Sequence, residues 1–164
     1  MVLDVLASGR GLSETWQKGQ FAFMALGMIA SALPVFMEPV GSVIAPDLAL
    51  KISGGIYTVF GLQMFLIPAF FMAENFIGYP EQGQAHLFLL FFMRMFGLFI
   101  LTVAMICFFL ADQPVLLKIF AGMNTIQIFQ GPGKAIQMFD VTPKHIVPVV
   151  LLPAVGFICA ATLL

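Results

Sequence analysis

The sequence predicts an all-α integral membrane protein, and three observations carry that prediction. The mean hydropathy of the 164 residues is +1.05, 61% of them are hydrophobic, and only 9% are charged. The apolar residues gather in long uniform runs. A membrane β-barrel would need alternating segments of about 10 residues, whereas a spanning helix needs about 20 consecutive apolar residues. The runs therefore favour a bundle of transmembrane helices.

Four apolar runs reach, or nearly reach, the length needed to cross a hydrocarbon layer of about 30 Å at about 1.5 Å of helical rise per residue. They comprise residues 21–45, 52–74, 87–111 and 146–164. We therefore predict one transmembrane domain over residues 1–164 with four spanning helices.

A fifth apolar segment, residues 115–130, is less certain because Lys118, Asn124, Gln127 and Gln130 dilute it. As a helix it would extend about 24 Å, which is short for a full span. It is either a fifth span buried among its neighbours or a helix that enters the membrane only in part.

The orientation in the membrane depends on that segment, because loops on the inner side carry the excess of lysine and arginine. With four spans, Arg10 and Lys18 lie opposite the other lysines, and the N-terminus is predicted outside. With five spans, Lys134 and Lys144 change sides, and the N-terminus is predicted inside. Both orientations stay open until the number of spans is known.

A weak internal repeat suggests two related helix pairs followed by an extra C-terminal helix. The tripeptide at residues 50–52 recurs at residues 117–119, and three further residues recur at the same offset: Gly55, Thr58 and Gln63 as Gly122, Thr125 and Gln130. The same offset places Phe21 on Phe88, where the first and third runs begin. The alternative is that these matches arose by chance, because the sequence is composed largely of a few hydrophobic residue types.

Three charges lie in or at the ends of these runs. An ionisable group inside a membrane costs about 2.5 kcal/mol or more, so it normally has a partner and marks a site. Arg94 lies in the third run, and Glu74 ends the second run on the same side. A snorkelling Arg94 would reach Glu74, a phosphate or a carbonyl there. Glu38 lies near the opposite side, so we expect no direct pair with Arg94. We interpret all three charges as serving assembly, with ligand binding as the alternative.

Several polar side chains have the chemistry of pigment ligands. His86 precedes the third run and is a candidate axial ligand for a chlorophyll magnesium or a haem iron. Haem ligation across two helices normally uses a second histidine, and His145 lies in a polar segment. Chlorophyll needs one ligand, so the candidates are His86, Asn75, Gln63 and Gln127. Chlorophyll, carotenoid or bound lipid each remains open as the bound group.

Signatures of other functions are missing from the sequence. It has no histidine, cysteine or carboxylate cluster with metal-ligand spacing, no nucleophile elbow and no phosphate-binding loop. We therefore predict that the chain is not an enzyme. It also lacks a basic cluster, which argues against binding to nucleic acid.

These observations lead to two hypotheses for the function. A net charge of −1, short polar segments and the abundance of Phe and Met favour a non-catalytic subunit of a larger energy-transducing complex, photosynthetic or respiratory. Its partners would be other integral membrane subunits and lipids, in a plastid thylakoid or mitochondrial inner membrane. The alternative is a small-molecule carrier or lipid-modifying enzyme that uses Glu38, Glu74 and Arg94.

Overall fold

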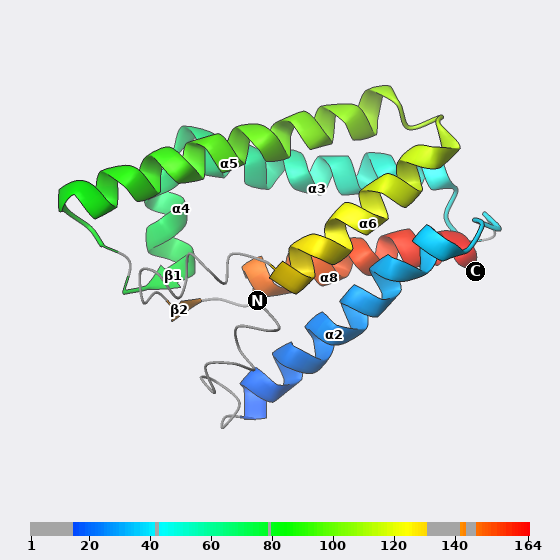
Figure 1. Cartoon of the computed structure of the whole chain (residues 1–164), viewed down its shortest axis with the longest axis horizontal. Helices are drawn as coiled ribbons and strands as arrows, with labels where there is room; N and C mark the ends of the chain where they lie inside the picture. Colours follow the sequence, from blue (N-terminus) through cyan, green and yellow to red (C-terminus); the bar gives the residue numbers. More distant parts are fainter. Residues whose placement is uncertain (1–14, 42, 79, 131–141, 144–146) are drawn as a thin grey trace.

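A computed structural model describes residues 15–41, 43–78, 80–130, 142–143 and 147–164 (Figure 1). Five long helices lie alongside one another: α2 (Thr15–Phe36), α3 (Pro46–Leu66), α5 (Gly83–Phe109), α6 (Pro114–Gln130) and α8 (Val147–Ala160). In Figure 1, α2, α5 and α8 run from left to right, and α3 and α6 run in the opposite direction. The prediction of an all-helical bundle is therefore confirmed.

The remaining elements are short. Helix α4 (Pro68–Asn75) follows α3, and the 3₁₀ helix η1 (Ala161–Leu163) follows α8. Strands β1 (Phe76–Ile77) and β2 (Thr142–Pro143) have two residues each and pair antiparallel at one end of the bundle.

Prolines occupy the first position of several helices. Two predicted boundaries differ from those in the structure. Pro46, Pro68 and Pro114 each occupy the first position of a helix, where no backbone N–H is needed. The predicted span 52–74 is wrong as one helix, because Ile67 has a non-helical backbone (φ −130°, ψ 52°) and Pro68 starts α4. The predicted span 21–45 is also too long, since α2 ends at Phe36.

The prediction of four membrane spans is not confirmed. Among the described residues, α3 and α5 are the two helices long and apolar enough to cross a membrane by length and composition. The first and last runs contribute shorter apolar helical stretches, Ala22–Phe36 and Leu151–Leu163. The uncertain segment 115–130 forms α6, which packs against α2 and α8 as a member of the bundle.

Small residues bring α3 and α5 into close contact. A Cβ atom added to Gly97 would lie 2.7 Å from the backbone nitrogen of Phe65 and 2.9 Å from the carbonyl oxygen of Gly61. One added to Gly54 would lie 3.0 Å from Cβ of Cys107. Missing side chains let the two backbones approach, which is a common mode of helix association in membranes.

The contact between α2 and α8 also depends on glycines that let the two backbones approach closely. A Cβ atom on Gly27 would overlap Pro153, and one on Gly156 would overlap the carbonyl of Gly27. Phe23 and Phe157 extend this contact with their rings 5.4 Å apart. Helix α8 is thereby fixed against α2.

The structure supports the internal repeat for α3 and α6. Residues 48–61 and 115–128 have the same pattern of buried, half-buried and exposed positions, except that Lys51 is exposed and Lys118 is half-buried. Helix α3 packs on α5, and α6 packs on α2. This is the pairing expected when α2–α3 and α5–α6 are equivalent repeats, each of which packs its second helix on the first helix of the other.

The predicted register of α2 on α5 differs from the structural one. The burial patterns of residues 22–37 and 95–110 agree at all but three positions, which aligns Phe36 with Phe109 rather than Phe21 with Phe88. The shift arises because the connection from α2 to α3 (residues 37–45) is longer than that from α5 to α6 (residues 110–113).

Candidate functional site

A buried cluster of hydrogen bonds lies where α2, α3, α6 and α8 meet. Asn124 on α6 is 1% exposed, and its Nδ2 donates to Oγ of Ser31 and to the carbonyl of Leu152, each at 3.0 Å. Ser31 on α2 in turn donates to the carbonyl of Ala121 at 2.9 Å. We call Ser31, Tyr57, Asn124 and Gln127 the polar cluster.

Tyr57 on α3 completes the polar cluster. Its hydroxyl oxygen lies 3.0 Å from Oδ1 of Asn124 and 2.8 Å from Oε1 of Gln127. A phenol has one hydrogen, so it donates fully to one of these oxygens at a time. Turning the Gln127 amide by 180° would present its NH₂ to the Tyr57 oxygen and give every contact a donor and an acceptor.

The chemistry of the polar cluster is suited to stabilising the packing of the helices. A buried polar group costs free energy unless it is hydrogen-bonded, so a satisfied cluster favours one arrangement of the helices. It contains amides and hydroxyls but no carboxylate, imidazole or thiol, and therefore no acid–base pair. Gln127 and Asn124 stand out in the sequence as polar residues within an apolar segment, whereas Ser31 and Tyr57 were not predicted. The available signal was the repeat, whose offset places Tyr57 on Asn124.

The four predicted pigment ligands lie on four different helices. Nδ1 of His86, in the first turn of α5, lies 2.9 Å from the carbonyl oxygen of Pro80. Nδ2 of Asn75 on α4 donates to the carbonyl of Phe71 at 2.8 Å. Gln127 belongs to the polar cluster, and Gln63 is half-exposed on α3. The residues that the structure describes contain no group of three or more histidine, cysteine or acidic side chains placed to hold a metal ion.

The predicted buried charges are not brought together. Nζ of Lys118 lies 2.6 Å from Oε1 of Glu38, whose side chain is 82% exposed. Glu74 is exposed on α4 and forms no ion pair with Arg94. The snorkelling contact between Arg94 and Glu74 is therefore absent from the described part of the chain.

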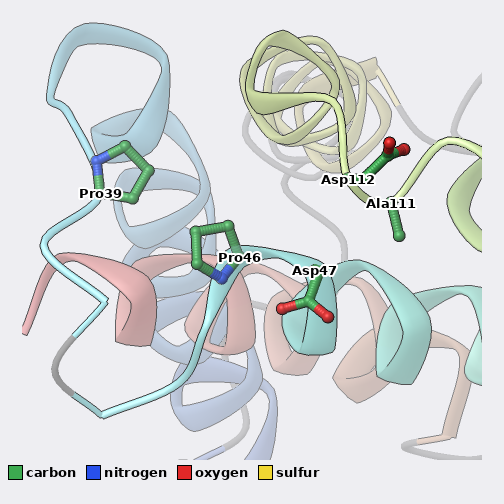
Figure 2. A pocket seen from close by; sticks show the side chains of 5 residues that line it. All are labelled: Pro39, Pro46, Asp47, Ala111 and Asp112. Atoms are coloured by element: carbon green, nitrogen blue, oxygen red, sulfur yellow. The ribbon is translucent and has the colours of Figure 1, made fainter.

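One end of the bundle carries a small hollow between the α2–α3 and α5–α6 connections. Its volume is about 230 Å³, and it is lined by Pro39, Pro46, Asp47, Ala111 and Asp112 (Figure 2). In Figure 2 the two carboxylates point in different directions. Asp47 also accepts a hydrogen bond from Lys51 at 3.1 Å. The hollow thus presents no converging set of ligand atoms.

Arg94 lies on the exposed side of α5 and makes no hydrogen bond or ion pair with any residue that the structure describes. Exposed apolar side chains flank it at helical spacing, with exposed fractions of 67% at Leu87, 62% at Phe91, 45% at Leu98 and 57% at Met105. We call these five residues the Arg94 stripe. It places a cation, with no partner in the described part of the chain, within an apolar helix face.

Comparisons with protein-family models, with curated proteins and with solved structures give no match.

Proposed function

We propose that the chain is an integral membrane protein that acts as a non-catalytic subunit of a larger membrane complex. The observation that carries the proposal is the exposed guanidinium of Arg94 within the apolar face of α5, a cation that has no ion-pair partner among the described residues. Lipid would solvate the apolar face, and a second protein would supply the partner of the cation.

The exposure of α5 supports the membrane part of the proposal. Only 33% of its most apolar stretch is buried, and the corresponding share for α3 is 39%. The core helix of a water-soluble protein with this composition would be mostly buried. An exposed apolar face that runs the length of a helix favours aggregation in water, whereas lipid solvates it.

We propose that α2, α6 and α8 cross the membrane together with α3 and α5. The polar cluster supports this, because its hydrogen bonds join α6 to α2, to α8 and to α3. With five spans, Arg10, Lys18, Lys134 and Lys144 belong to one side by sequence. The positive-inside rule then places the N-terminus inside.

The cost of Arg94 supports the subunit part of the proposal. A cation near the middle of a spanning helix costs about 2.5–3.5 kcal/mol, and such residues normally face protein rather than lipid. No anion for Arg94 lies within the described residues of this chain. A partner in the membrane would supply one.

The narrower proposal, an energy-transducing complex of a plastid thylakoid or mitochondrial inner membrane, rests on composition. Abundant Phe and Met suit packing against neighbouring helices, pigments or lipids. The alternative carrier or lipid-modifying enzyme is not favoured by the geometry. Glu38 pairs with Lys118, and Arg94 faces outward, so the three charges do not surround a common cavity.

The test is native electrophoresis of mildly solubilised source membranes, with mass spectrometry and an absorption spectrum of the band that contains the chain. We expect the chain to migrate with a complex several times its own mass of 17.9 kDa. A band of monomer mass in several mild detergents would overturn the subunit proposal. Colour in the complex would support the narrower one.

A further inference from the structure

We propose that the Arg94 stripe receives a transmembrane helix of a different protein, and that this helix carries a carboxylate at the depth of Arg94. The inference rests on the proposed function and names the chemistry of the partner.

The shape of the stripe suits a second helix. Its members, residues 87, 91, 94, 98 and 105, are separated by three, four or seven positions, so they lie in one line along α5. This spacing is that of left-handed helix pairs, whose axes cross at about 20°. Gly97 and Ala104 lie beside α3 instead. Leu101, on the same line between Leu98 and Met105, is half-buried against Gly61 of α3, so the stripe borders the α3 contact while its five members stay exposed.

The depth of Arg94 favours a carboxylate from protein over a lipid phosphate. Arg94 follows Gly83, the first residue of α5, by about 16 Å of helical rise and precedes Phe109 by about 22 Å. It lies about 10 Å beyond Leu87, where the exposed apolar face begins. By snorkelling, the long Arg94 side chain can place its guanidinium part of the way back toward the membrane surface. A carboxylate on an adjacent helix would meet the guanidinium in place, with two parallel hydrogen bonds.

A second copy of this chain is a poor occupant. A symmetric pair of copies would bring two Arg94 side chains to the same depth, where like charges repel strongly because the dielectric constant is low. The exposed acid Glu74 lies on α4, beyond the break at Ile67. It enters the test below as the self-association control.

Helix α2 is the counterpart of α5 in the repeat, and it has smaller residues at two positions of the stripe. In the structural register, Ala25 and Ala32 of α2 occupy the positions of Leu98 and Met105. The two alanines are half-buried, while Leu98 and Met105 are exposed. The buried positions of the two helices correspond throughout the compared range. The third difference, Val35 against Phe108, lies beside Gly54 of α3, whereas the positions of Leu98 and Met105 lie on the outer side of α5.

The experiment compares full-length variants expressed in the source organism. Arg94→Leu removes the charge, Arg94→Lys keeps it, and Met95→Leu is the matched control on a different exposed side of α5. We expect Arg94→Leu to lower the ratio of assembled to free chain by about tenfold or more, because a charge left unpaired in a contact weakens binding strongly. Arg94→Lys should keep most of the assembly, and Met95→Leu all of it. The thermal midpoint of the free chain should not change in any variant.

Photo-crosslinking identifies the occupant. A photoreactive residue at position 98 should label a membrane helix of another protein, while one at position 106, also exposed, should label mainly lipid. The labelled peptide should contain an Asp or Glu. Exchanging that acid for Arg in an Arg94→Glu background should restore assembly.

The outcomes separate this inference from the proposed function. If the wild-type chain migrates in a complex and Arg94→Leu migrates equally, the docking inference is wrong while the subunit proposal stands. Crosslinks to a second copy, with the same loss from Glu74→Gln, would replace the partner by self-association. Exclusive labelling of phospholipid at position 98 would replace the carboxylate by a headgroup phosphate. Either result overturns the inference.

Discussion

The hydroxyl oxygen of Tyr57 lies 3.0 Å from the side-chain oxygen of Asn124, and the two residues occupy the same position in α3 and α6. A contact between equivalent positions is expected where two equivalent repeats pack against each other. Asn124 then extends the contact to α2 through Ser31 and to α8 through the Leu152 carbonyl. The polar cluster thus joins both repeats to the additional C-terminal helix.

The first prediction concerns the centre of the polar cluster. Asn124→Leu has a similar volume but removes the partners of Ser31 and Tyr57. We expect it to lower the free energy of unfolding by about 1–3 kcal/mol, because buried polar groups lose their hydrogen bonds. Tyr57→Phe should cost less, about 0.5–1.5 kcal/mol. Chemical denaturation of the purified chain in detergent measures both values, and equal stability of Asn124→Leu and wild type would contradict a structural role.

The second prediction concerns the close contact of α3 and α5. Gly97→Ala places a Cβ atom 2.7 Å from backbone of the facing helix, so the helices must separate. We expect a loss of about 1–3 kcal/mol, typical of overpacking. Gly55→Ala is the matched control, since a Cβ there meets nothing within 4 Å. It should be neutral or stabilising by up to about 1 kcal/mol. Similar melting temperatures for both variants would contradict the packing described.

The third prediction concerns the number of spans. Single cysteines at Glu81, Gln113 and Lys134, in a background without Cys107 and Cys159, are treated with a membrane-impermeant thiol reagent. If α5 and α6 both cross, positions 81 and 134 react from the inner side and position 113 from the outer side. Reaction of positions 113 and 134 from the same side would show that α6 does not span.

The fourth prediction concerns the ion pair between Glu38 and Lys118. The Glu38 side chain is 82% exposed, so solvent weakens the attraction despite the 2.6 Å distance. We expect Glu38→Gln to change the unfolding free energy by less than about 1 kcal/mol. Assembly on native gels should also be unchanged. A large effect on either would assign Glu38 a role that its geometry does not indicate.

Sequence reasoning reached the helical class because apolar runs of this length have few alternatives. It also found the offset that relates α3 to α6, since Lys51 and Lys118 lie in matching tripeptides. It did not find the register of α2 on α5, which depends on the lengths of two connections. The predicted span 52–74 ran through Pro68 as one helix, because whether a proline bends or ends a helix depends on the neighbouring contacts.

The outward position of Arg94 was beyond sequence reasoning for a different reason. Helix α5 is apolar on every side, so its sequence has no polar face to mark the exposed direction. Packing against α3 through Gly97 decides which side is buried. The sequence identified Arg94 as the residue to examine, and the structure shows that its partner is not Glu74.

The most direct measurement is the fraction of chain that migrates in a high-mass complex on native gels, for wild type, Arg94→Leu and Met95→Leu. The account predicts that wild type and Met95→Leu are mostly assembled and that Arg94→Leu is mostly free but folded. Equal assembly of all three variants would show that Arg94 does not hold the chain in its complex. A free wild-type chain would contradict the subunit proposal itself.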